Sequence, residues 1–413
     1  KNMIMNKKLI SQIKNEWHSN LWLIVELFFV SVILWFVVDY VYTTMNTYHQ
    51  PIGFDLTHCY NITYSQLDPS NPNYDPNDTL PENDFKEIIS RLRQRSDIEA
   101  IGISSASVPY STSYIGEEVK YDTISRNVRM RKADSGFIRV FRIKGAQGES
   151  TEQLVRQFDK TPDGFIVASD FLGPNHPIKL ESLIGKRFYF GDSTKVDRLA
   201  AIVGRLRNND YELVGNTSSV IKHLENGVGD DISIRVKASQ DNDFKNRFWI
   251  YANRNLRVGN VYVSDIQSYQ DMRRTVNHPY DIIVRDFMIG AAFLLLNIFL
   301  GLLGTFWFRT QRRKSEVALF KALGATNGSV FARQMTEGLL LLTLATIPAI
   351  LIDLNLAYVG LNTSVDGVTL APGRFIVAVA ITYVLIALMI FFGNLMPARK
   401  AMKVQPAEAL HEE

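Results

Sequence analysis

The sequence predicts an α-helical membrane protein with four transmembrane helices and an α+β extracytoplasmic domain of two lobes, inserted between the first and second spans. Two observations carry this prediction. Four apolar runs each approach the roughly 20 residues that a helix needs to cross the hydrocarbon core of a bilayer. One long polar stretch, residues 45–283, separates the first run from the second and contains frequent turn signals.

Composition and motifs exclude several other classes of protein. The formal net charge of +3 is too small to indicate nucleic-acid binding, and the basic residues are scattered. The single cysteine, Cys59, cannot form an intrachain disulfide. The sequence has no Gly-Lys-Ser/Thr phosphate-binding loop, no HExxH or GxSxG motif and no paired cysteines. We therefore expect no enzyme activity, no catalytic residue, no cofactor and no metal in this chain.

The first span is expected at residues 21–44, after an N-terminal segment of residues 1–20. Its apolar run is followed by polar residues rather than by the small residues of a cleavage site, so we interpret it as an uncleaved anchor. Glu26 lies inside this run, where an ionisable group is costly. We expect its side chain to reach the interface or to face another helix.

The inserted stretch, residues 45–283, is expected to be α+β. Residues 85–95 place apolar side chains at helical spacing, whereas residues 164–168 and 231–237 have the short or alternating apolar patterns of strands. A more β-like lobe is expected at about residues 145–229, between flanking portions that pair with each other.

A stalk helix is expected to lead from this domain to the second span. Ser264 and Gln267 form a capping-box pattern that predicts its start. Pro279 is a potential break in this helix.

The remaining spans are expected close together in the last third of the chain. The predicted order is span 284–308, loop 309–334, span 335–361, turn 362–373, span 374–396 and tail 397–413. Pro348 and Asp353 indicate that the outer end of the third span is kinked or lies at the interface.

The basic residues predict the orientation of the chain. Several Lys and Arg residues occur in the N-terminal segment, in loop 309–334 and in the tail, whereas turn 362–373 has none. Cytoplasmic segments carry this excess of basic residues. Both termini are therefore expected in the cytoplasm.

The stretch RRKSEVALFKALGAT, residues 312–326, predicts an amphipathic helix within loop 309–334. Its apolar residues at helical spacing are Val317, Phe320 and Leu323. Arg312 is expected to pair with Glu316 one turn on, and Gly324 to end the helix before Thr326 or Ser329 begins the next. These residues alone fit equally a helix held at an anionic lipid surface and a helix that docks on a partner.

The same stretch resembles the cytoplasmic loop of the MacB/FtsX-like ABC permeases, which reads R-x-R-E-I-G-L-R-K-A-L-G-A. The tail from Pro397 to Leu410 is similar to the family ending, P-A-R-x-A followed by x-P-x-E-A-L. Weaker similarities occur at residues 133–141, 183–186 and 201–204. The order of one span, a large MacB-like domain and three further spans matches over the whole chain. The chain departs from the loop motif at two positions. It has Ala318 where the family has glycine, and Phe320 where the family has a basic residue.

The resemblance implies a multi-pass permease of the bacterial cytoplasmic (inner) membrane. It implies a dimer, with a second copy or a similar permease, and a cytoplasmic ABC ATPase that binds ATP and Mg. Because only about twenty residues precede the first span, we expect the ATPase on a separate chain. The ATPase-coupling residues that the resemblance implies are Arg312, Glu316, Lys321, Leu323, Gly324 and Ala325. A periplasmic adaptor and an outer-membrane channel are further partners that the family allows, and membrane lipid surrounds the spans.

Two functions stay open at this point. One is export or extraction of a substrate by mechanotransmission, in which ATP hydrolysis by the partner moves the outer domain. The other is an FtsX-like regulator that activates a cell-wall hydrolase or signals across the membrane. The large size of the outer domain favours the first, and the sequence does not identify a substrate.

Overall fold

The computed structural model describes residues 17–78, 80–173, 176–191, 196–213, 217–365 and 367–402. The chain divides into two compact units. We call them the membrane unit (residues 1–46, 281–364 and 368–413) and the inserted domain (residues 47–280, with 365–367). Most of the expected N-terminal segment and the tail motif from Val404 to Leu410 lie outside the described residues.

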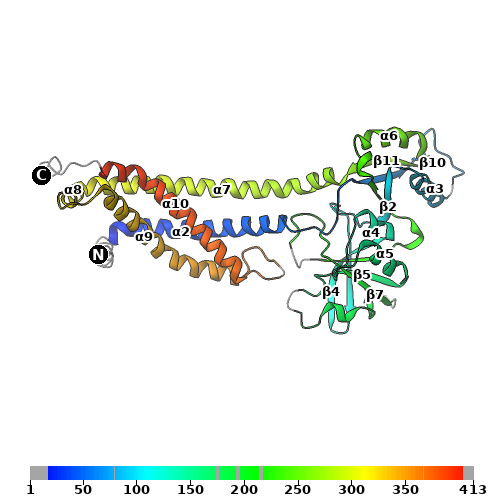
Figure 1. Ribbon diagram of the computed structural model, residues 1–413, viewed down its shortest axis with the longest axis horizontal. Helices are drawn as coiled ribbons and strands as arrows, with labels where there is room; N and C mark the ends of the chain where they lie inside the picture. The colour runs from blue at the N-terminus through cyan, green and yellow to red at the C-terminus, as the bar shows by residue number, and fades with distance from the viewer. Residues whose placement is uncertain are drawn as a thin grey trace. The chain divides into compact units, whose positions relative to one another are not determined.

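Four described helices are long and apolar enough to cross a membrane, and a mixed α/β domain lies between the first and second of them in the sequence, so the predicted fold class is confirmed. The four are α2 (Trp17–Tyr48), α7 (Tyr269–Arg312), α9 (Asn327–Tyr358) and α10 (Pro372–Met402) (Figure 1). Between α7 and α9 lies the short helix α8 (Lys314–Ala322). The helix α9 continues through Pro348 to Tyr358.

Small residues allow the helices of the membrane unit to approach closely. A Cβ atom on Gly338 of α9 would lie 2.7 Å from Cγ2 of Ile390 in α10. A Cβ atom on Gly301 of α7 would lie 2.5 Å from Oε1 of Glu26, so Glu26 faces α7, which is one of the two positions expected for it.

The inserted domain is built on one 11-stranded sheet whose order is β10-β11-β1-β9-β2-β4-β3-β6-β7-β5-β8. The strands are β1 (Cys59–Gln66), β2 (Ile98–Ser105), β3 (Ile115–Tyr121), β4 (Ile124–Ala133), β5 (Gly164–Ala168), β6 (Arg187–Phe190), β7 (Val196–Val203), β8 (Ser218–His223), β9 (Asp231–Val236), β10 (Arg257–Val258) and β11 (Val261–Ser268). The α-helices of this domain are α3 (Pro81–Arg93), α4 (Ser135–Val140), α5 (Thr151–Asp159) and α6 (Phe244–Asn255).

One lobe combines strands β10, β11, β1, β9 and β2 with helices α3 and α6. The helix expected at residues 85–95 is present as α3, and Phe85, Ile88, Ile89 and Leu92 form its buried face. These side chains share a core with Ile232 and Ile234 of β9 and with Phe244 and Phe248 of α6. The apolar spacing that predicted the helix is thus the face that packs on the sheet.

The other lobe is a closed ring of strands. Strands β4, β3, β6, β7, β5 and β8 follow one another in the sheet, and β8 pairs in parallel with β4, from Val128 opposite Ser218 to Ala133 opposite His223. Val119, Phe165, Phe188 and Val220 belong to its core. The sequence predicted that this lobe begins near residue 145. It begins earlier, at Ile115, because β3 and β4 are needed to complete the ring.

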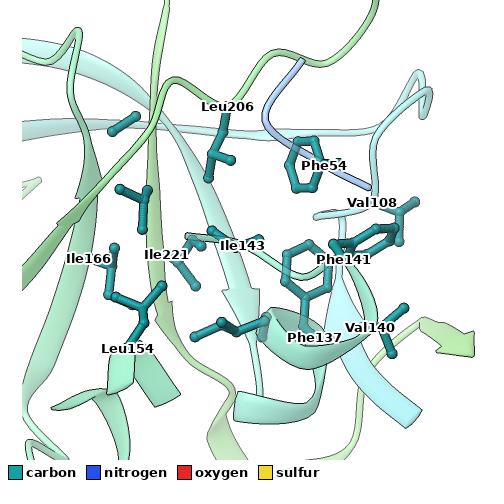
Figure 2. Packing of buried hydrophobic residues seen from close by; sticks show 14 of the residues in the cluster. Phe54, Val108, Phe137, Val140, Phe141, Ile143, Leu154, Ile166, Leu206 and Ile221 are labelled. Carbon is teal, nitrogen blue, oxygen red and sulfur yellow. The ribbon is translucent and has the colours of Figure 1, made fainter. Parts of the chain in front are cut away.

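A third core contains residues of α4, α5 and β5 (Figure 2). Phe137 and Phe141 pack edge to face against each other and against Phe54. Asp134 caps α4, since its carboxylate accepts hydrogen bonds from the backbone N–H groups of Phe137 (3.0 Å) and Ile103 (2.9 Å). This cap fixes α4 against β2.

The start predicted for the stalk helix is wrong. Ser264 and Gln267 lie in β11, which pairs with β1: Gln267 is opposite Asn61, and Ser264 occupies the irregularity beside Thr63, to whose carbonyl its Oγ donates at 3.1 Å. The helix α7 begins at Tyr269, and Ser268 Oγ accepts a hydrogen bond from the N–H of Asp271 at 3.1 Å. Pro279 does not interrupt α7 (Figure 1).

We expect the substitution Gly102→Ala to destabilise the protein. A Cβ atom at Gly102 would lie 2.5 Å from both Cα and N of Phe137, and backbone atoms cannot move aside as a flexible side chain can. Overpacking of this kind costs about 1–3 kcal/mol. The measurement is the thermal unfolding temperature of the full chain in detergent, which should be lower in the variant than in the wild type. Gly204→Ala is the matched control, because nothing lies within 4 Å of its Cβ position. Equal unfolding temperatures for the two variants would contradict this packing.

Asp231, at the start of β9, should make the stability of the inserted domain depend on pH. Burial, and then the neighbouring charge of Asp230, raise the pKa of Asp231 to about 6 from an ordinary value of 3.8. Between pH 3.8 and about 6 the folded state therefore holds a proton that the unfolded state has lost, so the cost of the buried charge is complete above about pH 6 and falls as the pH drops from 6 toward 3.8.

We expect Asp231→Asn to stabilise the protein at pH 7 by on the order of 1–3 kcal/mol, and to flatten the rise in unfolding temperature from pH 7 to pH 5. Thermal unfolding at several pH values checks this, with Asp159→Asn, at an exposed position on α5, as the control. A pH profile that is the same in wild type and Asp231→Asn would exclude this origin.

Candidate functional site

The candidate site is the helical hairpin formed by the end of α7, by α8 and by the start of α9. At Arg313 the backbone leaves the helical region, which separates α7 from α8. Gly324 has φ +91°, a left-handed conformation that favours glycine at a helix end. Thr326 caps α9 by accepting a hydrogen bond from the N–H of Ser329 at 3.3 Å. The predicted helix end at Gly324 is confirmed, and Thr326 is the residue that starts the next helix.

A buried carboxylate holds this hairpin together. Glu337 of α9 is 6% exposed and accepts from Nη1 of Arg309 at 3.0 Å and from Nη1 of Arg313 at 2.9 Å. Arg309 also donates to Oδ1 of Asn20 in α2 at 2.5 Å. Charge-assisted bonds to a buried group are stronger than those at a surface. The network therefore connects α2, α7 and α9.

A second pair of charges crosses the hairpin. Oε1 of Glu316 lies 2.8 Å from Nη2 of Arg333, and Oε2 lies 3.9 Å from Nε of Arg313. The predicted pair between Arg312 and Glu316 is wrong, because the break at Arg313 interrupts the helix on which that spacing depended. The guanidinium of Arg333 also lies over the ring of Phe320, 4.2 Å from its centroid.

These side chains surround a cavity of about 320 Å³. Phe306, Val317 and Val330 contribute apolar surface to its wall, and the two ion-pair networks contribute the charged part. The arrangement is amphipathic: it offers apolar contact beside fixed charges that already have partners. Among the residues that line it, the hydroxyls of Ser329 and Thr310 bond to a backbone carbonyl and to the amide of Gln334, so neither is paired with a base.

The structure divides the six expected coupling residues among different positions. Glu316 and Ala325 line the cavity. Arg312 and Gly324 are exposed, and Leu323 is 76% exposed. Lys321 donates to the backbone carbonyl of Met402 at 2.7 Å, which ties α8 to the end of α10.

The exposed apolar surface of α8 differs from the predicted face. The prediction grouped Val317, Phe320 and Leu323, but Val317 and Phe320 line the cavity. Leu323 is instead exposed together with Leu319, which is 51% exposed and one turn earlier on α8. We call Leu319 and Leu323 the leucine pair.

Four residues of the site escaped the sequence analysis: Arg309, Arg313, Arg333 and Glu337. The signal that could have found them is the position of Glu337 directly before the third apolar run, together with two arginines four residues apart after the second run. An ionisable residue at such a position needs a partner.

Comparison with known proteins places this hairpin in a family. Residues 288–406 match the model of the FtsX-like permease C-terminal family. The resemblance to the FtsX-like permeases is confirmed. This matched segment contains all of α8 and every residue that lines the cavity, so the site lies within the part of the chain that is similar to the FtsX-like permeases. The FtsX-like permeases are permease components of ABC transporters and are not themselves the ATPase.

No curated protein matches the chain. Among solved structures, the crystal structure of the extracellular domain of the noncanonic ABC-type transporter YknZ from Gram-positive bacteria matches at 11% identity and a TM-score of 0.32, over 50% of this chain and 100% of that one.

Within the described ranges, no group of three or more His, Cys, Asp or Glu residues is placed to hold a metal ion.

We expect Glu337→Ala to destabilise the membrane unit strongly. Removing this carboxylate takes from Arg309 and Arg313 the buried acceptor that they share, and losing one partner of a buried pair costs about 3–5 kcal/mol. Thermal unfolding in detergent measures the loss. Arg312→Ala, a charge change at an exposed position on the same hairpin, is the control and should leave the unfolding temperature nearly unchanged. If both variants unfold at the same temperature, Glu337 does not hold the hairpin together.

Proposed function

We propose that this chain is the permease subunit of an ABC-type transporter and works by mechanotransmission. ATP hydrolysis by a separate cytoplasmic ATPase would move the α8 hairpin, and α7 would carry this motion to the inserted domain for export or extraction of a substrate. The observation that supports this proposal is the continuity of α7, one helix from the end of β11 to the hairpin.

The first turns of α7 are bound firmly to the inserted domain. Asp210, which is buried, accepts hydrogen bonds from Nε and Nη2 of Arg273 (2.9 and 3.0 Å) and from Nδ2 of Asn277 (2.5 Å). Tyr269, the first residue of the helix, is fully buried in the core that contains Phe141. A displacement of α7 would therefore move this core rather than slide past it.

The last turns of α7 are bound to the α8 hairpin by Arg309 and its partner Glu337. The proposal places the ATPase on the leucine pair and the adjoining turn at Gly324, since exposed apolar side chains are a usual centre of protein interfaces. ATP and Mg would bind to that ATPase. A second permease copy, identical or similar, would complete the assembly.

The orientation that fits this proposal has the hairpin and both termini in the cytoplasm and the inserted domain outside. It agrees with the excess of basic residues on the hairpin side of the spans. The membrane is the bacterial inner membrane in this proposal. Reconstitution with the ATPase separates the two functions: net movement of a substrate supports export, whereas activation of a cell-wall hydrolase without transport supports regulation.

We expect Leu323→Asp to abolish the stimulation of ATPase activity that the permease causes in proteoliposomes, while the protein stays folded. Leu323 is 76% exposed, so a charge there does not disturb the core, but it would oppose an apolar contact. Glu316→Lys is a less selective test, because it also breaks the contact with Arg333.

Tyr358→Asp is the matched control for this prediction. Tyr358 is 78% exposed, about as much as Leu323, but it lies at the far end of α9, the helix that begins at the hairpin. The two variants therefore introduce the same charge at equally exposed positions that are far apart along the helix. Tyr358→Asp should keep full stimulation. Full stimulation by Leu323→Asp, with the ATPase bound at wild-type affinity, would show that the ATPase docks elsewhere.

A further inference from the structure

A second polar site lies within the membrane unit. Asp353 of α9 is 2% exposed, and Ser31 and Trp35 of α2 are 3% and 1% exposed. The three side chains line one small cavity, of about 10 Å³, together with Thr382 of α10. Three spanning helices thus contribute polar groups to one point inside the bundle.

Three of the polar atoms at this point lack partners. Among the described residues, Oδ1 of Asp353, Oγ of Ser31 and Nε1 of Trp35 are buried and make no hydrogen bond. Each unsatisfied buried group costs about 1–3 kcal/mol, so three around one cavity indicate an occupant. One water needs about 10–15 Å³ and typically makes about three hydrogen bonds. A water here could accept from Trp35 and donate to Asp353 and Ser31.

The charge of Asp353 also lacks compensation at this site. The residues that line the cavity include no Lys, Arg or His, and the other titratable group among them is Tyr383, whose hydroxyl lies 3.1 Å from Oγ1 of Thr343. Asp39 provides the contrast: it is 1% exposed in α2, but Nε of Arg374 donates to it at 2.7 Å. An isolated carboxylate inside a membrane protein is costly and is neutralised by a proton or a bound cation.

The donors around the cavity favour the proton. The indole N–H of Trp35 can only donate, so it repels a cation and suits a neutral acid with a water. The hydroxyls of Thr346 and Thr382 donate to the backbone carbonyls of their own helices, at 2.8 and 2.9 Å. We propose that Asp353, Ser31 and Trp35 form a proton-binding site inside the membrane unit, in which Asp353 carries its proton at neutral pH and one water bridges the three side chains.

The site joins α2, α9 and α10 while it is closed and neutral. If the helices separated and water entered, the hydrated carboxylate would no longer be penalised and the proton would leave. Release or uptake of this proton would then accompany any motion of the bundle that opens the cavity.

Infrared difference spectroscopy of the full chain in detergent tests the proposal. At pH 7 the wild type should show the C=O stretch of a protonated carboxyl, and the band should shift on exchange into D₂O and disappear in Asp353→Asn. Ser31→Ala should keep the band but shift it, because it removes one partner of the water. Asp39→Asn, which alters the ion-paired aspartate of α2, is the matched control and should retain the band.

Three results would overturn the proposal. The first is a wild-type spectrum at pH 7 without a protonated-carboxyl band. The second is a band of full intensity in folded Asp353→Asn, which would assign it to another residue. The third is loss of the band when Na⁺ replaces a large organic cation in the buffer, which would make this a cation site. The first and third results need no variant, so they hold even if a substitution prevents folding.

Discussion

The structure of the membrane unit depends on one buried carboxylate, Glu337, between Arg309 and Arg313. The other polar links of the hairpin are more exposed: Glu316 with Arg333, and Lys321 with the backbone carbonyl of Met402. Two arginines on one carboxylate orient the end of α7 relative to α9 more strictly than apolar packing would, since hydrogen-bond geometry is directional. The hairpin can therefore behave as one body with α7 rather than as a loose loop.

A buried carboxylate also fixes the beginning of α7, there with the side chain of one arginine rather than two. There Asp210 is the buried carboxylate, and Tyr110 donates to it at 3.0 Å beside the bonds from Arg273 and Asn277. Arg207, which is 1% exposed, donates to the backbone carbonyl of Asp210 at 2.9 Å and to that of Thr47 at 3.0 Å. Directional hydrogen bonds therefore hold α7 at its beginning and at its end.

Hydrophobicity was sufficient to predict the membrane helices and the core-facing side of α3, because burial of apolar side chains decides those elements. Sheet pairing was not predictable in the same way: the capping pattern at Ser264 and Gln267 is a local signal, and the pairing of β11 with β1 overrides it. The site was predicted in part. Glu316 and Gly324 came from the motif, but the role of Glu337 depends on arginines distant in the sequence, and Arg312 lost its expected partner to a single break in the helix.

The closed ring in the inserted domain has a consequence for what this domain can recognise. Pairing of β8 with β4 removes the backbone edge that β8 would otherwise present. A peptide that binds by adding a strand needs a free edge of several residues. The ring offers no such edge at β8, so capture of an extended chain there, and edge-to-edge aggregation through that strand, are both disfavoured. At the other end of the sheet β10 pairs with Val261 and Tyr262, and none of the described strands covers the rest of β11 on that side, so a partner that adds a strand would have to bind along β11.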